Sequence, residues 1–362
     1  MKEKHYSLSP ILAKHATYNI IIGERSNGKT YALLKYILQQ YIEHGNQAAL
    51  LRRWMEDFTG TRGQQMFSAL VNNGEIEKLT EGHWTDVYYH GSKWYLCNWL
   101  EDGKRFIDDA PFCYGFALTS MEHDKSVSFP KITTIVFDEF ISRSAYIPDE
   151  FVLYMNCLST IIRQRNNVTI FMLGNTVNKY CPYYAEMGLT HIRQQKQGTI
   201  DVYQYGDSRL TVAVEYCQAQ KTSKQSDHYF AFDNPRLNMI TSGSWEIDIY
   251  PHCPCKYKPK DILFRYYIIF QEDALECEIV ATEDQTFTFI HPKTTDIKDK
   301  DNQVIYSTDF SAMPGHHRNI TKPTTNIEKR IADYYKRDKV FYSSNEVGEI
   351  VRNYLLWCTK QA

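Results

Sequence analysis

The segment Gly23 to Thr30, GERSNGKT, has the composition and spacing of a phosphate-binding loop. In such a loop, glycines let successive backbone N–H groups turn toward phosphate oxygens at the start of a helix. Lys29 would then reach the β- and γ-phosphates, and the Thr30 hydroxyl would hold Mg²⁺. We therefore expect a site for ATP and Mg²⁺. The expected nucleotide-binding residues are Gly23, Glu24, Arg25, Ser26, Asn27, Gly28, Lys29 and Thr30.

An acidic pair, Asp138 and Glu139, follows the apolar run ITTIVF. At the carboxyl end of a buried parallel strand, such a pair lies where ligands bind in α/β sheets. We expect Asp138 to orient Mg²⁺ through water and Glu139 to act as the general base for the attacking water. The alternative is an acidic pair that merely caps the end of a strand.

Six further positions are candidates for a catalytic role. Asn175 ends the run VTIFMLGN and is expected to hydrogen-bond the γ-phosphate or the water, unless it only forms a turn. Arg163 and Arg165 follow a predicted helix, and either is a candidate arginine finger that acts in a neighbouring subunit. Cations at a solvated helix C-terminus are the alternative. Arg25 and the pair Arg52 and Arg53 are further finger candidates.

Strands and helices alternate through the first part of the chain, and the strands lack polar faces. This pattern indicates an α/β fold in which helices cover a parallel sheet, here a P-loop NTPase domain of the RecA-like (ASCE) type. We expect a helix over Asp57–Val71 and hairpin turns near Gly91 and Gly103. Expected strands are Tyr18–Ile22, Ala48–Leu51, Lys131–Phe137 and Val168–Leu173, and expected helices are Thr30–Ile42 and Pro148–Arg165.

The pattern changes after Cys217, where QAQKTSKQSD is polar and has no apolar period. We expect an ATPase domain over residues 1–217, a linker over 218–245 and a smaller C-terminal α/β domain over 246–362. In the last of these, strand-like runs are followed by two helical ones. The expected elements are Leu263–Phe270, Leu275–Ala281, Gln285–His291, Asn326–Arg337 and Asn345–Trp357.

Composition excludes several classes of protein. The net charge is −2, so the chain is no general polycation, and any nucleic-acid contact must be local. The apolar runs are far shorter than the ~20 residues of a membrane span, and we expect a cytoplasmic protein without membrane contact. Nine cysteines without repeated spacing indicate free thiols. His252, Cys253 and Cys255 could ligate a metal, but no fourth ligand stands at a familiar spacing.

Several segments of the first 185 residues or so, in this order, resemble the DNA-packaging ATPase of small phi-29-like bacteriophages. They are IIGERSNGKTYA, LLRRW, KSVSFPKITTIVFDEF, YIPDEF, IIRQRNNVTIFMLGNT and CPYY. The resemblance implies a ring of subunits, a pentamer, that docks at the portal of an empty procapsid in the host cytoplasm and drives double-stranded DNA inward. It also implies a packaging RNA as partner. By resemblance, Arg163 is the trans-acting arginine finger, Arg25 the arginine of the loop, and Lys125 a lysine at the subunit interface.

The C-terminal third resembles that family only faintly and is consistent with a vestigial RNase H-like nuclease domain. A working nuclease needs carboxylates gathered on metals, but Leu263–Phe270 contains Arg265 and no carboxylate. We expect this domain to bind nucleic acid through its phosphates without cutting it. An ordinary solvated helix face is the alternative. The candidate contacts are Lys256, Lys258, Lys260, Lys329, Arg330, Lys336 and Arg337.

The leading hypothesis is an ATPase that couples hydrolysis to translocation of double-stranded DNA into a procapsid, without nuclease activity. One alternative is a P-loop helicase or another nucleic-acid-remodelling ATPase. Another is a nucleotide-gated scaffold with little turnover. A translocation assay distinguishes the first alternative, and steady-state hydrolysis distinguishes the second.

Overall fold

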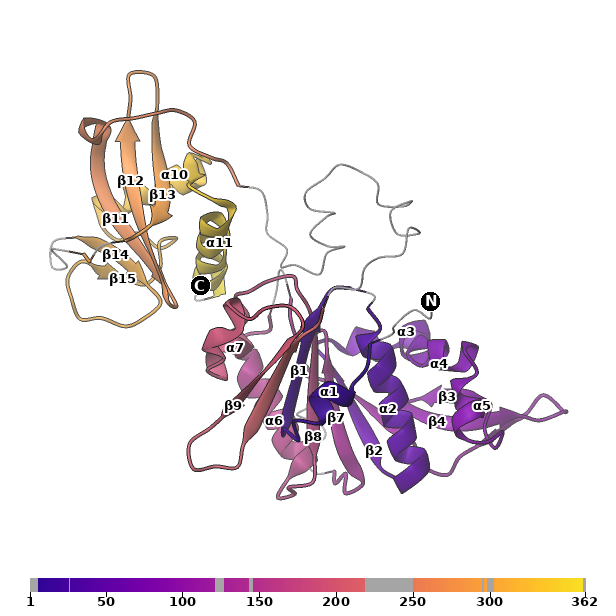
Figure 1. Cartoon of the computed structure of the whole chain (residues 1–362). Coiled ribbons are helices and arrows are strands. Elements are labelled where there is room, and N and C mark those ends of the chain that lie inside the picture. Colours follow the sequence, from indigo (N-terminus) through magenta and orange to yellow (C-terminus); the bar gives the residue numbers. More distant parts are fainter. Residues whose placement is uncertain are drawn as a thin grey trace. The chain divides into compact units, whose positions relative to one another are not determined.

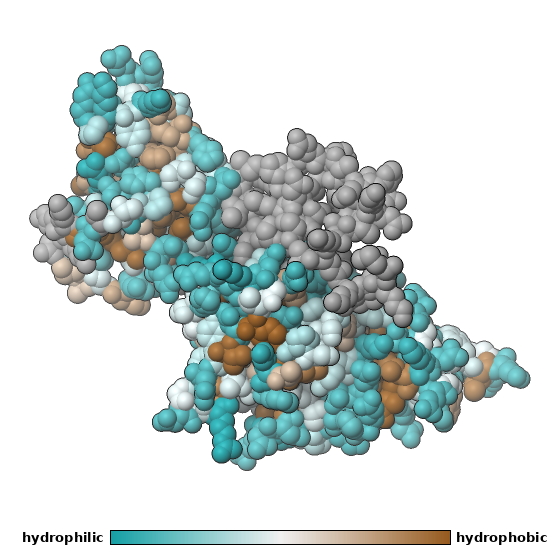
Figure 2. Space-filling view, in the orientation of Figure 1, coloured by the Kyte–Doolittle hydropathy of each residue, from teal (hydrophilic) through white to brown (hydrophobic). Residues whose placement is uncertain are grey.

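The computed structural model describes residues 6–25, 27–120, 127–142, 146–218, 250–294, 296–297 and 303–360. The chain divides into two compact units, Met1–Glu246 and Ile247–Ala362 (Figure 1). On the face of the molecule seen in Figure 2, hydrophilic residues dominate the described surface and hydrophobic residues gather in separate patches. Among the described residues, no helix combines the length and apolar character that a membrane crossing requires.

The first unit is built on a ten-stranded sheet with the order β3-β4-β6-β2-β7-β8-β1-β10-β9, and β5 pairs with β4. The adjacent strands from β6 to β10 run parallel, and antiparallel strands extend both ends. The parallel strands are β1 (Tyr18–Gly23), β2 (Gln47–Arg52), β6 (Cys113–Ala117), β7 (Ile132–Asp138), β8 (Thr169–Asn175) and β10 (Thr211–Tyr216). The others are β3 (Asp86–His90), β4 (Lys93–Trp99), β5 (Arg105–Ile107) and β9 (Thr199–Gln204).

Helices cover both faces of this sheet (Figure 1). On one face, Leu33 and Ile37 of α2 pack on Phe171, while Tyr154 and Tyr183 of α6 and α7 pack on the other. Because both faces are buried, the central strands are mainly apolar, and every residue of β1, Asn19 included, is buried. The expected helix-covered parallel sheet is confirmed. Its helices are α1 (Ser9–Leu12), α2 (Lys29–His44), α3 (Gly60–Gln65), α4 (Ser68–Asn72), α5 (Glu75–Leu79), α6 (Glu150–Ile162) and α7 (Pro182–Glu186), with short 3₁₀ turns η1 (Met55–Phe58) and η3 (Thr190–Arg193).

Strand β8 lies between β1 and β7 in the sheet. The register pairs Gly23 with Asn175 and Asp138 with Leu173. Because these strands are parallel, the loop after β1, the end of β7 and the end of β8 meet at one edge of the sheet. This topology brings the phosphate-binding loop, the acidic pair and Asn175 together.

The expectation of one helix over Asp57–Val71 was wrong, since η1, α3 and α4 occupy this range. Gly60 has φ +54°, and the chain breaks again at Phe67. Phe67 is buried with its ring 4.9 Å from that of Phe112 and 5.5 Å from that of Trp94. A kinked path lets Phe67 reach the core, and this burial outweighs the continuity of the helix. The expected hairpin turns near Gly91 and Gly103 are confirmed by the pairing of β3, β4 and β5.

The second unit has a six-stranded sheet with the order β15-β14-β11-β12-β13-β16. Strands β11, β12 and β13 form an antiparallel meander, and β14 and β16 run parallel to β11 and β13. Two helices lie on one face, where the Tyr266 and Tyr335 hydroxyls are 3.0 Å apart. The bounds are η4 (Pro259–Asp261), β11 (Ile262–Phe270), β12 (Asp273–Ala281), β13 (Thr286–Pro292), β14 (Val304–Ser307), β15 (His316–His317), β16 (Val340–Tyr342), α10 (Asn326–Lys336) and α11 (Asn345–Lys360).

The expected meander and both C-terminal helices are confirmed, with ends that shift by a few residues. Helix α10 begins with a reciprocal cap: the Thr325 hydroxyl accepts the Glu328 N–H at 3.2 Å, and Glu328 Oε2 accepts the Thr325 N–H at 2.7 Å. The predicted linker at 218–245 lies, except for residue 218, outside the described residues.

Candidate nucleotide-binding site

The loop between β1 and α2 has the backbone that phosphate binding requires. Gly28 precedes the helix with φ +88°, a left-handed conformation that glycine adopts without strain. Gly23 is needed for space, because a Cβ there would lie 2.8 Å from Cys217 Cβ on the end of β10. Lys29 then opens α2. Ser26 lies outside the described residues.

Lys29 is folded back over this loop and is buried. Its Nζ donates to the Glu24 carbonyl oxygen at 2.6 Å and to Asn27 Oδ1 at 3.0 Å. Burial lowers the pKa of the Lys29 ammonium, and nearby Cys217 and Asp138 oppose that shift. The Lys29 ammonium is therefore held beside the loop by two uncharged oxygens. A bound phosphate would offer it negatively charged oxygens in their place.

The acidic pair at the end of β7 is bound to Arg52, the last residue of β2. The two guanidinium nitrogens Nη2 and Nη1 lie 2.7 Å from Asp138 Oδ2 and 2.7 Å from Glu139 Oε2, respectively. Asp138 is nearly fully buried, and burial raises the pKa of its carboxyl, while Arg52 lowers it. The side chain of Glu139, in contrast, is 62% exposed. Arg52 thus supplies the positive charge that pairs with both carboxylates at this edge of the sheet.

Glu139 has φ +60°, a left-handed conformation that costs a non-glycine residue ~1–2 kcal/mol. Its N–H donates to Asp138 Oδ1 at 3.1 Å, and the next N–H, of Phe140, donates to the Leu173 carbonyl on β8. This turn stops β7 and sends the Glu139 side chain toward solvent beside Asp138. Strain of this kind is found at functional sites, where the surroundings enforce it.

Arg53 supports the same turn from the other side. Its Nε and Nη2 lie 2.8 Å from the two carboxylate oxygens of Glu150, and it also donates to the carbonyls of Glu139 and Phe140. Glu150 also accepts the Tyr183 hydroxyl at 2.8 Å. All of these groups but Glu139 are at least largely buried. Arg53 therefore fixes the backbone of the acidic pair through contacts within the chain.

The phosphate-binding loop, the acidic pair, Arg52 and Arg53 line one cleft with a volume of about 790 Å³ at the carboxyl edge of the parallel strands. Asn175, at the end of β8, contributes to the same wall as the loop and the acidic pair. The predicted residues that the structure brings together here are Arg25, Asn27, Gly28, Lys29, Thr30, Asp138, Glu139 and Asn175, and Arg52, Arg53 and Trp54 join them.

Arg163 and Arg165 lie elsewhere, near the amino end of β7. Arg163 is exposed, and its Nη2 donates to the Val127 carbonyl at 2.8 Å. Arg165 donates to the carbonyls of Ile132 at 2.6 Å and Ile161 at 2.8 Å, so it satisfies the end of α6 and the start of β7. Neither side chain lines the cleft of its own subunit. Lys125 lies outside the described residues.

In the second unit, every basic residue predicted to contact nucleic acid is exposed; these are Lys256, Lys258, Lys260, Lys329, Arg330, Lys336 and Arg337. Arg337 is paired with Asp333 at 2.8 Å. His252 and Cys253 make separate contacts, with the carbonyl oxygens of Tyr342 and Cys255. Within the described part of the chain, His252, Cys253 and Cys255 do not form a group with metal-ligand spacing.

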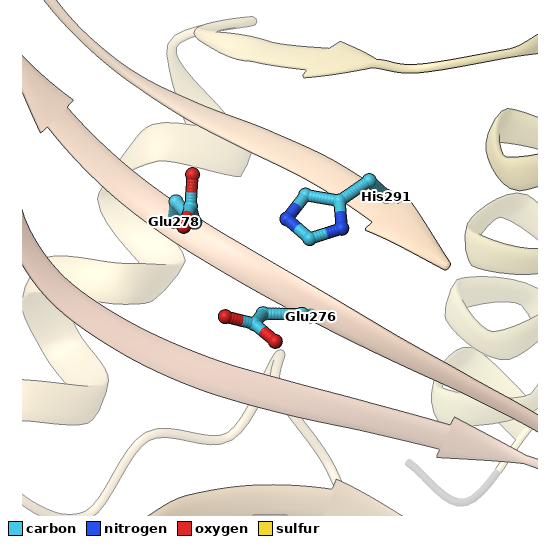
Figure 3. A group of neighbouring side chains, drawn as sticks. All are labelled: Glu276, Glu278 and His291. Carbon is cyan, nitrogen blue, oxygen red and sulfur yellow. The ribbon is translucent and has the colours of Figure 1, made fainter. Parts of the chain in front are cut away.

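The group with such spacing among the described residues is Glu276, Glu278 and His291, on the neighbouring strands β12 and β13 (Figure 3). Arg265 Nε lies 3.1 Å from Glu276 and 3.0 Å from Glu278. Lys293 lies 3.1 Å from Glu276, and the Tyr257 hydroxyl donates to Glu278 at 2.6 Å. The carboxylates are therefore neutralised by side chains of the protein itself, and the residue that sequence analysis singled out, Arg265, lies between them.

The sequence missed Arg52 as a partner of the acidic pair, since it was grouped with Arg53 among the finger candidates. One signal was available: Arg52 and Arg53 follow the apolar run AALL, so they stand at the carboxyl end of a buried strand. That β2 neighbours β7 cannot be read from the sequence. The pairing of Leu51 with Phe137 aligns Arg52 with Asp138.

Comparisons with known proteins point in one direction. The family described as podovirus DNA encapsidation protein (Gp16) matches residues 1–204. A DNA packaging protein of Bacillus phage B103 is 29% identical over 175 residues, 47% of this chain and 48% of that protein. A DNA packaging protein of Bacillus phage phi29 is 29% identical over 191 residues, 52% of this chain and 51% of that protein. The match thus spans about half the length of these relatives.

Among solved structures, a chain of the bacteriophage phi-29 viral genome packaging motor assembly shares the fold. The similarity covers 99% of both chains with a TM-score of 0.57 and 19% sequence identity. The resemblance inferred from the sequence motifs is confirmed by these matches.

Proposed function

Because the chain belongs to the podovirus DNA encapsidation protein family, we propose that it is an ATPase that drives double-stranded DNA into a phage procapsid. The observation that carries this proposal is the single cleft shared by Lys29, the acidic pair and Asn175. A phosphate-binding loop alone occurs in many unrelated activities. The added carboxylate of Glu139 supports hydrolysis by water over transfer to another acceptor.

The residues present fit ATP with Mg²⁺. Thr30 and Asp138 offer the hard oxygen ligands that Mg²⁺ prefers, and Asn27, Gly28 and Lys29 of the loop line the same cleft. When bound, Mg²⁺ neutralises charge on the phosphate oxygens. Arg25 lines the same cleft and would add a positive charge near them.

Glu139 is the proposed general base, and Asn175 the residue that positions the water or the γ-phosphate. The Glu139 carboxylate lies 2.7 Å from the Arg52 guanidinium. The Glu139 side chain is 62% exposed, so it can leave Arg52 and contact a water molecule in the cleft.

Arg52 and Arg53 line the cleft but are held by carboxylates of the same chain, which supports the contribution of a further cation by a second subunit. Arg163 is exposed at the opposite edge of the sheet and is the proposed trans-acting finger. Arg165 is occupied by carbonyl groups and is the weaker candidate. A ring, pentameric by resemblance, would bring Arg163 and Lys125 to the neighbouring site.

The second unit is proposed to be a vestigial RNase H-like domain that binds nucleic acid and does not cut it. Its antiparallel meander with parallel β14 beside the first strand supports this fold. Arg265 between Glu276 and Glu278 supports the lack of nuclease activity. The same proposal places the domain limits at 217 and 246. It includes the procapsid portal and a packaging RNA as partners and the host cytoplasm as location.

The experiment compares wild-type protein with Glu139→Gln, using purified procapsid, DNA and ATP. We expect wild-type protein to yield nuclease-protected DNA and to hydrolyse ATP faster when DNA and procapsid are present. Glu139→Gln should bind ATP but hydrolyse it at least a hundredfold more slowly, in keeping with the usual size of general-base effects, ~10²–10⁴. Unchanged turnover in this variant would exclude the mechanism. Strand separation without DNA protection would instead identify a helicase, and negligible wild-type turnover a scaffold.

A further inference from the structure

The antiparallel strands β3, β4 and β5 extend the large sheet on the side of α3, α4 and α5 (Figure 1). Side chains along a strand alternate between the two faces of the sheet. On one face, Trp94 and Leu96 of β4 are buried, and Trp94 Nε1 donates to the Gly63 carbonyl of α3 at 2.8 Å. Tyr95 and Trp99 of the same strand therefore point to the face opposite these helices.

We call this second face of the extension the aromatic strip. The register sets Tyr95 opposite Tyr88 of β3 and Trp99 opposite Arg105 of β5, so three strands contribute to it. Trp99 is 54% exposed. Exposed aromatic groups gathered on one face mark interaction sites, whereas single scattered ones do not. The strip consists of Tyr88, His90, Lys93, Tyr95, Trp99 and Arg105.

The rings of the strip are in contact with cations. The Arg105 guanidinium lies 4.1 Å from the centroid of the Trp99 ring and 5.3 Å from that of Tyr88. Lys93 Nζ lies 5.8 Å from the ring centroid of Tyr114 on the neighbouring strand β6. Cation–π contacts of this kind hold a ring and a charge side by side. The strip thus presents flat ring surfaces with positive charges next to them.

The charges of the strip favour an anionic partner. The carboxylate of Asp86 belongs to the same face, but its Oδ2 accepts Trp99 Nε1 at 2.8 Å. Glu101 and Asp102 stand in the turn between β4 and β5, where Asp102 lies 3.1 Å from Lys104. The exposed cations of the strip contact aromatic rings instead, so their positive charge is available to a phosphate.

Flat rings beside cations suit an unpaired nucleobase and its phosphate. A base stacks on an aromatic ring or on a guanidinium plane, and stacking on a ring requires no particular base. A duplex keeps its bases stacked on each other and offers its phosphates to such a surface. A duplex would therefore use the cations of the strip but not the rings.

We propose that the aromatic strip binds a single-stranded segment of DNA or RNA. A base extends the stack of Arg105 on Trp99, and Lys93 and Arg105 contact phosphates. This binding is separate from the ATP site and from the basic residues of the second unit, and it requires no nucleotide.

The test measures binding of fluorescein-labelled oligomers to the full chain by fluorescence anisotropy, without ATP. The probes are oligo(dT), oligo(rU) and a DNA duplex, each of ~16 nucleotides per strand, the upper site size of one OB fold. Trp99→Ala removes the ring, and Trp99→Phe keeps one. Phe106→Ala is the matched control, since Phe106 is 57% exposed on β5 but stacks with Trp84 on the other face. Thermal unfolding verifies that each variant folds.

We expect Trp99→Ala to weaken binding of both single strands by about fivefold or more and to change duplex binding less than twofold. Trp99→Phe and Phe106→Ala should stay within twofold of wild type. Arg105→Gln is the second variant should Trp99→Ala fail to fold. It should lower the dependence of single-strand affinity on salt, as a logarithmic slope, by about 0.7, the value for one phosphate contact. Lys104→Gln, outside the strip, should keep the wild-type slope.

Equal single-strand affinity of Trp99→Ala and wild type would overturn the inference, as would the absence of single-strand binding by wild-type protein. An equal loss of single-strand and duplex binding would also overturn it, because the ring would then not act by stacking. Sedimentation velocity is measured in parallel. If Trp99→Ala changes the oligomeric state and leaves single-strand binding intact, the strip is an interface between copies of the chain. These measurements do not involve ATP turnover, so their outcome is distinct from that of the proposed function.

Discussion

Replacement of Arg52 by glutamine removes a guanidinium that contacts two carboxylates and keeps a side chain of moderate length. Asp138 and Glu139 would then lie next to each other without a cation at the end of β2. Removing one partner of a buried ion pair costs about 3–5 kcal/mol because the other charge stays buried. Here the Asp138 side chain is 5% exposed and that of Arg52 14%, so their pair belongs to this class.

The Glu139 half of the interaction adds little, because the Glu139 side chain is 62% exposed and exposed pairs contribute only ~0–1 kcal/mol. We therefore expect Arg52→Gln to lower the free energy of unfolding of the first unit by about 3 kcal/mol at pH 7. The measurement is urea-induced unfolding of nucleotide-free protein followed by circular dichroism. Lys104→Gln, which breaks an exposed pair with Asp102 at 3.1 Å, is the control and should leave the transition unchanged.

The loss should depend on pH in a defined direction. Burial raises the pKa of the Asp138 carboxyl and Arg52 opposes this rise, so the folded-state pKa is higher still in Arg52→Gln. A group whose folded-state pKa is raised loses stability as the pH rises through that value. The loss caused by Arg52→Gln should thus be smaller at pH 4 than at pH 7, because the Asp138 carboxyl binds its proton more fully at the lower pH. An equal loss at both pH values, or none at pH 7, would refute the reasoning.

Two further predictions concern the other arginines. Arg53→Ala and Glu150→Ala should each destabilise the chain by about 3–5 kcal/mol, and the double variant by clearly less than the sum, as urea unfolding in a double-mutant cycle would show. If the loss of stability in the double variant equalled the sum of the two single losses, Arg53 and Glu150 would not be coupled. Arg163→Ala and Glu139→Gln should each abolish ATP turnover in pure rings, but a mixture should regain part of it, because an intact Glu139 then meets an intact Arg163 of its neighbour. No recovery in mixed rings would argue that Arg163 does not act across an interface.

The elements that position the site were predictable where the apolar pattern was long. Strands β1, β7 and β8 are mainly apolar, and α2 has a clear helical period, so their limits differ from the expected ones by only a few residues. Strands β9 and β10 were not predicted. The run TIDVYQ of β9 alternates with polar residues, since β9 forms the edge of the sheet, and TVAVEY of β10 has only three consecutive apolar residues.

For the candidate site, residue types alone predicted the loop, the acidic pair and Asn175. The different partners of Arg52 and Arg53 were not predictable from the sequence, in which the two residues are adjacent. Neighbouring residues at the end of a strand point to opposite faces. Arg52 therefore meets Asp138 at the cleft, while Arg53 reaches Glu150 on the buried side. Which face carries which carboxylate depends on the strand order, and this order is a property of the fold.

The contact between Gly23 and Cys217 has a consequence for how this family can vary. A Cβ on Gly23 would lie 2.8 Å from Cys217 Cβ, so the first glycine of the loop is required by a side chain from a distant strand and not by its own backbone angles. In natural or laboratory evolution, an alanine at position 23 should be accepted only together with a glycine at position 217. The residues at these two positions, far apart in the printed sequence, should therefore change together.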